Sequence, residues 1–199
     1  MRVKSEARRQ AIMDVAADAF RERGFDSTSM SDVAARVGGS KATLYNYFCS
    51  KEALFAAVMM EAIKVQARPI VETFAGSVDL EAGLHRFVRD YTRLMLQPET
   101  LAMNRMCVAE GERCGFGAEL FEAGPKILLT MIAERLQQAM DAGVLRRADS
   151  WRAAFHLKGL CEAGLIEQRL RGCRAQPSDI EIEQNADAAA DTFLRAYRA

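Results

Sequence analysis

The chain has 199 residues, half of them hydrophobic, and its 27 Lys and Arg balance its 27 Asp and Glu. This is the composition of an ordinary globular protein with one large or two small domains, and the zero net charge argues against a generally basic nucleic-acid binder. No apolar run approaches the roughly 20 residues of a membrane span and no apolar signal-peptide core follows Met1, so we expect a cytoplasmic protein without a membrane partner.

The first predicted helix covers Glu6 to Arg23. Its apolar residues recur at helical spacing, and Gly24 gives it a C-terminal stop. Phe25 follows the stop, and we expect it to pack with Phe20 beneath the next helices.

The stretch from Thr28 to Lys51 predicts two short helices, a tight turn and the start of a third helix. Ser29 is an N-cap, and Asp32 three residues later can complete a capping box. Gly38 and Gly39 end the first short helix, because glycine adopts the left-handed conformation of a C-terminal cap without steric cost. Ser40 then caps the second.

The second short helix has an inward side and an outward side. Leu44 and Phe48 lie four residues apart, so they share the inward face. A helix of about two turns is unstable alone in water, so tertiary packing must hold it while its polar side stays free. Two short helices with a glycine turn are typical of the helix-turn-helix, whose second helix enters the DNA major groove.

The outward side chains suit contact with double-stranded DNA. Thr43 and Tyr45 can bond phosphates or base edges, Asn46 can pair with adenine, and lysines can neutralise phosphates. Up to Lys51 the sequence has 9 Lys and Arg against 6 Asp and Glu, whereas the remainder has 18 against 21, so positive charge gathers where DNA is expected. The predicted DNA-binding residues are Ser29, Ser40, Lys41, Ala42, Thr43, Tyr45, Asn46, Tyr47 and Lys51.

These motifs together resemble the N-terminal DNA-binding domain of the TetR family of transcriptional regulators. The resemblance covers about Arg9 to Met59 and departs at Gly39, where the family usually has an apolar residue. It implies an all-α fold: an N-terminal three-helix bundle with the helix-turn-helix (residues 1–55) joined to a C-terminal helical ligand-binding and dimerisation domain (residues 56–199). The pattern that carries it is Met30-Ser-Asp-Val-Ala, Gly38, Ser40-Lys-Ala-Thr-Leu-Tyr-Asn-Tyr-Phe and Ser50-Lys-Glu-Ala-Leu-Phe.

The remaining chain is helical by its hydrophobic period. Ser50 caps a helix from Lys51 to about Phe74, in which Pro69 predicts a kink or an early end near Arg68, of which we expect the early end. Gly124-Pro125 predicts either a kink or a new helix with proline at its first position. The later predicted helices are Leu80 to Leu96, Glu99 to Arg113, Ala118 to Ala142, Ser150 to Gly172 and Ser178 to Arg198.

Three segments between Gln97 and Pro125 resemble the AefR-like C-terminal domain of one TetR subfamily, over about Glu81 to Cys173. The resemblance implies an effector-binding domain, and its methionines and aromatic residues favour a small apolar or aromatic effector. For each of these residues taken singly, plain core is the favoured interpretation. The predicted lining is Phe87, Tyr91, Met95, Met103, Met106, Cys107, Glu110, Phe121, Leu128, Met131, Trp151 and Phe155.

The resemblance further implies a homodimer, formed by the last two helices and their symmetry mates. Such a dimer would set two recognition helices about one DNA turn apart, to match a palindromic operator. Together these features predict a ligand-responsive transcriptional repressor, in which effector and operator weaken each other's binding.

Other classes of function remain to be weighed. The sequence has no GxSxG, HExxH, P-loop or Rossmann pattern, and only His85 and His156 as histidines, so we expect no enzyme, no metal and no cofactor. One alternative is a thiol redox-sensing regulator, because Cys107 and Cys114 are seven apart on one helix face, although about 10.5 Å separates them. The other is a helical adaptor that does not bind DNA. The five cysteines include no CxxC pair, which indicates reduced thiols.

Overall fold

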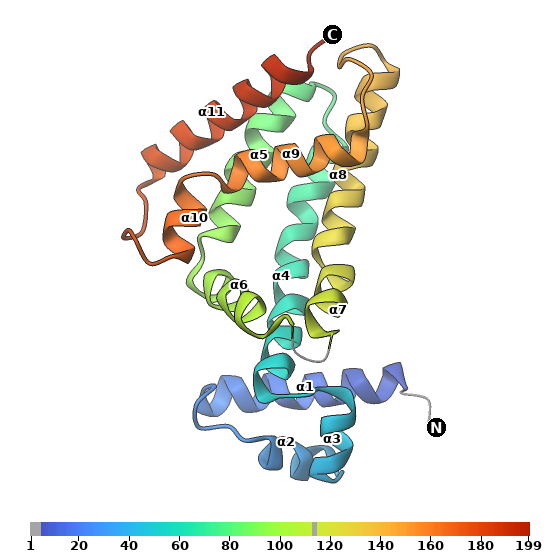
Figure 1. Cartoon of the computed structure of the whole chain (residues 1–199), viewed down its shortest axis with the longest axis vertical. Coiled ribbons are helices and arrows are strands. Elements are labelled where there is room, and N and C mark those ends of the chain that lie inside the picture. Colours follow the sequence, from blue (N-terminus) through green and yellow to red (C-terminus); the bar gives the residue numbers. More distant parts are fainter. Residues whose placement is uncertain (1–4, 113–114) are drawn as a thin grey trace. The chain divides into compact units, whose positions relative to one another are not determined.

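The computed structural model describes residues 5–112 and 115–199, and in these residues the secondary structure is α-helical apart from one isolated bridge between Leu145 and Arg198 (Figure 1). This confirms the predicted all-α fold. The chain divides into two compact units: residues 1–62 with 103–121, and residues 63–102 with 122–199. The boundary predicted between residues 55 and 56 stays a prediction.

The first unit contains α1 (Glu6–Arg23), α2 (Met30–Val37), α3 (Lys41–Tyr47) and the start of α4 (Lys51–Ala75). Their apolar faces meet in one core, because the buried positions of each helix recur at helical spacing. The rings of Phe20, Phe25 and Phe55 form an aromatic cluster in this unit, with ring centroids 4.9 to 5.9 Å apart. The largest core side chains are Ile12, Met13, Phe20, Met30, Val33, Leu44, Phe48 and Leu54.

The predicted caps of α2 and α3 are confirmed. Ser29 and Asp32 form the full capping box, and the hydrogen bonds from Ser29 lower the pKa of the Asp32 carboxyl. Gly38 ends α2 in the left-handed conformation, with φ 69° and ψ 44°. The Ser40 hydroxyl accepts from the Thr43 amide at 3.1 Å. These bonds fix the ends of two helices that are too short to be stable alone.

The Arg8 side chain lies beside Gly39, the second residue of the turn. A Cβ added at Gly39 would lie 3.1 Å from the Arg8 guanidinium, which donates to the Val37 carbonyl at 3.3 Å. The arginine tip therefore lies beside the turn, close to the position that a side chain at residue 39 would take.

Gly39→Ala should leave folding stability unchanged or raise it by about 0.4–1 kcal/mol, since alanine restricts the unfolded chain and the arginine tip can move aside. Gly38→Ala is the matched change at a positive φ of 69°, and it should lower stability by about 1–2 kcal/mol. Thermal unfolding of both variants measures this difference. Equal losses would show that the Gly39 backbone also needs glycine.

The predicted early end of the fourth helix at Arg68 is wrong. Helix α4 continues through Pro69 to Ala75. Proline removes one amide, which would otherwise bond the carbonyl four residues back. Both Pro69 and Val65 are exposed, so water can satisfy that carbonyl and the helix persists.

The second unit contains the rest of α4, α5 (Leu80–Met95), α8 (Pro125–Asp141), α9 (Ser150–Glu162), α10 (Leu165–Leu170) and α11 (Asp179–Tyr197). Two further helices, α6 (Pro98–Glu110) and α7 (Phe116–Ala123), each divide between the units. The predicted end of α6 at Arg113 falls outside the described residues.

Two predicted long helices are each divided. Of the two alternatives predicted at Gly124-Pro125, the start of a new helix is correct, since Pro125 is the first residue of α8. The single helix from Ser150 to Gly172 is wrong, because Gly164 has φ 78° and ψ −93°, which is not helical, and α10 starts after it.

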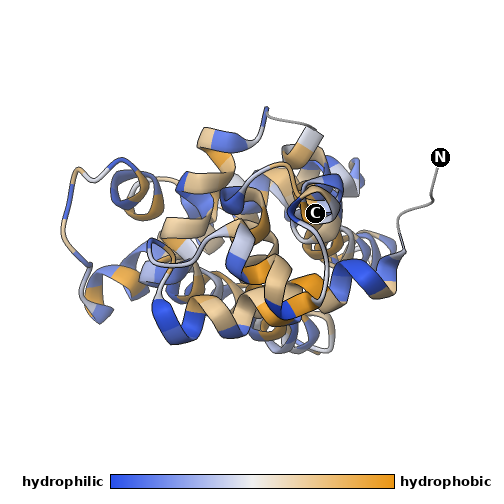
Figure 2. Cartoon of the chain, turned by 90° about the horizontal axis from the view of Figure 1, so that it is seen from below, coloured by the Kyte–Doolittle hydropathy of each residue, from blue (hydrophilic) through white to orange (hydrophobic). Residues whose placement is uncertain are grey.

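The core of the second unit lies between α4, α5, α8, α9 and α11. Phe87 is at its centre, 5.0 Å from the Phe74 ring and 5.7 Å from the Tyr91 ring. Helix α11 lies beside α5 and α9 (Figure 1). Hydrophilic residues interrupt the apolar ones along the helices (Figure 2), and among the described residues we find no helix with the length and apolarity to cross a membrane.

Candidate DNA-binding face and effector site

Helix α3 separates an inward from an outward face as predicted. Leu44 and Phe48 are 0% and 3% exposed and belong to the core of the first unit. Tyr45 is 44% exposed, and Thr43 is half-buried. The exposed side of the turn and helix consists of Ser40, Lys41, Ala42, Tyr45 and Asn46.

This face is held in place by the Arg9 side chain of α1, by the Ser5 amide that precedes α1, and by the helix caps. The Arg9 guanidinium lies 5.1 Å from the Phe48 ring centroid, so a cation covers the end of the helix. The Tyr47 hydroxyl accepts from the Ser5 amide at 3.3 Å. A helix fixed at both ends can present Tyr45 and Asn46 without losing further conformational entropy on binding.

Several predicted DNA contacts already have partners within the protein, among them Thr43, whose hydroxyl lies 2.9 Å from the Ser40 hydroxyl. Ser29 and Ser40 cap helices, and Tyr47 bonds Ser5. The Lys51 ammonium donates to the Phe25 carbonyl at 2.9 Å and lies 4.1 Å from that ring's centroid. Their contacts with DNA stay predictions, but Lys51 also joins two segments of the fold.

Helix α7 contributes to the surroundings of α3, which the sequence did not indicate. A hollow of about 220 Å³ borders the end of α3 and is lined by Phe116 and Glu119 as well as by Tyr45 and Asn46. Residues 103–121 thus belong to the same compact unit as the helix-turn-helix. Sequence separation from α3 hides this proximity, and no local pattern marks it.

The predicted effector lining is distributed over both compact units, and its assembly into one site stays a prediction. Its members Met103, Met106, Cys107, Glu110 and Phe121 belong to the first unit, and the other seven belong to the second. In the second unit Phe87 and Tyr91 are buried core. Trp151 and Phe155 are 37% and 41% exposed on α9, packed edge to face at 5.4 Å.

Tyr91 carries a buried polar group into this core. Its hydroxyl donates to the Glu162 carboxylate at 2.7 Å, and Lys158 pairs with the same carboxylate at 2.7 Å. Burial, with Glu162 adjacent, raises the pKa of Tyr91 well above its usual range. The phenol therefore stays a neutral donor, and its bond ties α5 to α9.

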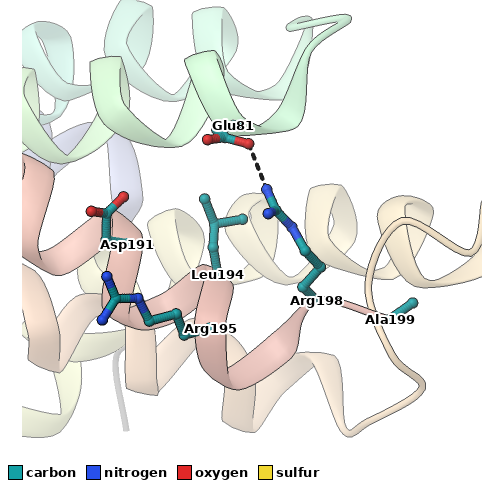
Figure 3. Close-up of a pocket in the computed structure, with 6 residues that line it drawn as sticks. All are labelled: Glu81, Asp191, Leu194, Arg195, Arg198 and Ala199. Atoms are coloured by element: carbon teal, nitrogen blue, oxygen red, sulfur yellow. Dashed lines mark hydrogen bonds and ion pairs between the residues drawn. The ribbon is translucent and has the colours of Figure 1, made fainter.

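Two surface hollows of about 350 Å³ each lie in the second unit. One is lined by Glu81, Asp191, Leu194, Arg195, Arg198 and Ala199, and Arg198 pairs with Glu81 across it (Figure 3). Four of its six lining residues are charged, two of each sign, unlike the mostly apolar lining usual for a small-molecule site. The other lies between α4 and α8 and contains Leu128 and Met131 from the predicted lining.

The structure does not favour the redox alternative. Helix α6 ends at Glu110, so it does not carry Cys107 to Cys114, which lies outside the described residues. Burial raises the pKa of the Cys107 thiol to about 11 and raises the pKa of Cys161 further. Neither thiol is a ready nucleophile at neutral pH, because the thiolate is the reactive form.

In the native protein, iodoacetamide should therefore alkylate exposed Cys173 well before Cys107 or Cys161. The Cys107 rate should rise about tenfold per pH unit up to a pH of about 11, following its thiolate fraction. Peptide mass spectrometry measures each rate, with protein unfolded in guanidinium chloride as the reference. Equal native rates for Cys107 and Cys173 at neutral pH would reinstate the redox-sensing alternative.

In the part of the chain that the structure describes, no group of three or more His, Cys, Asp or Glu side chains is placed to hold a metal ion. His85 instead bonds Asp187 at 2.9 Å, and His156 bonds the Tyr197 hydroxyl at 2.6 Å. Both histidines thus join α11 to neighbouring helices.

Comparison with known proteins agrees with this architecture. Residues 12–58 match the family of bacterial regulatory proteins named tetR, and residues 82–199 match the C-terminal domain of AefR-like transcriptional repressors. The HTH-type transcriptional regulator RutR of Escherichia coli is 33% identical over 91 residues, which cover 46% of this chain and 41% of RutR. This chain thus spans less than half the length of that relative.

Two solved structures resemble the whole chain. A TetR-family transcriptional regulator from Mesorhizobium loti MAFF303099 is 27% identical with a TM-score of 0.76, and the match covers 100% of both chains. The flavonoid-responsive regulator FrrA is 29% identical with a TM-score of 0.65, covering 98% of each chain. With a helix-turn-helix of this geometry and both domain models matched, the chain belongs to the TetR family of transcriptional regulators and is not an enzyme.

Proposed function

We propose that this regulator is a ligand-responsive repressor that binds a palindromic DNA operator as a homodimer. The observation that carries the proposal is the face of α3. It exposes Lys41, Tyr45 and Asn46 from a helix that caps and buried Leu44 hold in place. An ammonium, a phenol and an amide side by side suit phosphate and base-edge contacts.

The repressor assignment is supported by the C-terminal match to AefR-like transcriptional repressors. Ligand response is supported by FrrA, which is described as flavonoid-responsive. The predicted effector is small and apolar or aromatic.

Helices α9 and α11 are proposed to form the homodimer. The support is Trp151 and Phe155, two large aromatic side chains that α9 leaves exposed and stacked edge to face. Exposed aromatic pairs are typical of interface anchors. A dimer is needed because one seven-residue helix in one half-site gives little affinity, whereas two joined half-sites act with a high effective concentration.

Coupling between effector and operator is proposed to run through α4 and residues 103–121. Helix α4 starts in the first unit and ends in the second, and α7 residues line the hollow beside α3. An effector that binds one arrangement of these segments more tightly would shift the population of operator-binding dimers. Linkage then requires operator and effector to weaken each other equally.

Selection of fragments from the source organism's genomic DNA by the immobilised full chain tests this function. The enriched fragments should share a two-fold symmetric sequence with half-sites about one DNA turn, or roughly 10 base pairs, apart. The free protein should sediment as a dimer. Fragments without a shared sequence, or a monomer that binds a single half-site, would contradict the proposal.

A further inference from the structure

The groove between α4 and α8 has the size of a small-molecule site. Its volume of about 350 Å³ lies within the range of roughly 300–1,000 Å³ that is usual for such sites. All of its lining residues belong to the second compact unit. Its apolar lining is Ala67, Val71, Ile127, Leu128 and Met131.

These apolar residues pass from buried floor to open rim. Val71 is 2% exposed and belongs to the core, and Leu128 and Met131 pack against that core while remaining partly exposed. Ile127 at the rim is 52% exposed. An apolar body seated here would remove this surface from water, which is favourable in proportion to the area covered.

The polar part of the lining is predominantly cationic. Lys64 and Arg68 lie four residues apart on α4, so they occupy the same side of the helix, and Glu72 is the one acidic residue among those that line the groove. The lining therefore carries two positive charges and one negative charge. An anion complements this balance, and a cation does not.

The ion pair in the groove leaves Arg68 able to bind a ligand. Arg68 and Glu72 are 2.7 Å apart, with side chains 77% and 53% exposed, and such exposed pairs hold weakly. A guanidinium has five N–H donors. Arg68 can therefore donate to a second carboxylate while it keeps Glu72.

The start of α8 adds charge of the same sign. Gly124 lines the groove as the N-cap of this helix and makes no side-chain cap bond, and Pro125 follows it. The amides at a helix N-terminus carry partial positive charge. This agrees with the charges on α4.

We propose that the groove between α4 and α8 binds an amphipathic organic anion, a carboxylate on an apolar body, and that such an anion is the effector of this regulator. The second clause rests on the function proposed above, whereas the binding site itself does not. The apolar body covers Leu128, Met131 and Ile127, and the carboxylate binds Arg68 and Lys64. The proposal thus adds an anionic head to the apolar effector predicted from the sequence.

Calorimetric titration of the full chain with two matched probe pairs tests the site. The acids are decanoate and 2-naphthoate, and the neutral partners with the same bodies are decanol and 2-naphthalenemethanol. At least one acid should bind about tenfold or more tightly than its alcohol, as expected for a charge-assisted hydrogen bond. Equal affinities within both pairs, or no binding of either acid, would overturn the proposal.

Substitutions locate the binding. The double variant with Lys64→Gln and Arg68→Gln should lose the preference for acid over alcohol. Arg171→Gln is the matched control, because Arg171, at the end of α10 and outside the groove, also pairs with a glutamate four residues away, Glu167 at 2.9 Å. This variant should keep the preference for acid over alcohol. Ile127→Glu, at the exposed rim, should weaken both acids about tenfold or more by repulsion. Loss of the preference in Arg171→Gln alone would place the anion elsewhere.

A DNA arm separates the two proposals. The same acids are added to the protein bound to its selected fragment. The anion is supported as the effector if the acid releases the DNA fragment, the alcohol does not, and the double variant no longer responds to the acid. If the acid binds but the operator complex stays intact, the anion is not the effector, and the DNA-binding function stands. If the chain binds the acid but selects no DNA, the proposed function alone is contradicted.

Discussion

Leu44→Ala should lower the free energy of unfolding by about 2–5 kcal/mol, the cost usual for truncating a fully buried leucine. Leu44 is 0% exposed in the core that α1, α2, α3 and α4 build in the first unit. Alanine removes the buried methyl groups and leaves a cavity beneath the recognition helix. Because α3 has only seven residues, it cannot stay ordered once its packing is lost.

Urea unfolding of the wild type and the variant measures this loss. Asn46→Ala is the control on the same helix, since Asn46 is exposed and surface changes usually stay within about 0.5 kcal/mol. An unchanged unfolding midpoint for Leu44→Ala would show that α3 does not face inward through this residue.

Tyr45→Ala and Asn46→Ala should each weaken operator binding about 30-fold or more, since a lost base-edge or phosphate contact costs about 1 kcal/mol or more and a dimer loses it twice. Both side chains are exposed on α3, so folding stability should change little. Fluorescence anisotropy with the selected operator measures the affinity.

Gln10→Ala is the control, because Gln10 is exposed on α1 and bonds Asp14 on its own helix. Its operator affinity should stay unchanged. Lys51→Ala would be a poor probe, since the structure commits its ammonium to the Phe25 carbonyl and stability should fall with affinity. If Tyr45→Ala and Asn46→Ala bound the operator as tightly as the wild type, the DNA-binding face would lie elsewhere.

Local chemistry made the helix-turn-helix predictable. Ser29, Asp32, Gly38 and Ser40 each act within one turn of their own position, so residue type and spacing suffice to place α2, the turn and α3. The inward position of Leu44 follows from helical period alone.

Predictions that depended on surroundings failed. Proline usually ends a helix, but Pro69 and Val65 lie on the exposed side of α4, which the sequence does not reveal. The single helix predicted over Ser150 to Gly172 is divided at Gly164, whose positive φ precedes the start of α10. In both places the decisive factor is the environment of one backbone group.

The candidate sites show the same division. The exposed residues of α3 could be named in advance, but the internal bonds of Lys51 and the presence of Glu119 beside α3 depend on segments distant in sequence. Apart from Glu110, the predicted effector residues were named mainly for apolar or aromatic character, a property that core and pocket residues share. Phe87 and Tyr91 proved to be core, whereas Leu128 and Met131 line a groove.

The measurement that tests the central claim most directly is the affinity of the protein for its selected operator across a salt series, with scrambled DNA of equal length beside it. If two α3 faces lie on the DNA with their lysines at phosphates, the logarithm of the operator association constant should fall linearly as the logarithm of salt concentration rises. Preference for the operator over scrambled DNA should persist, because base contacts set it. An operator affinity that does not change with salt concentration, or equal affinity for the operator and the scrambled DNA, would contradict operator binding through the two α3 faces.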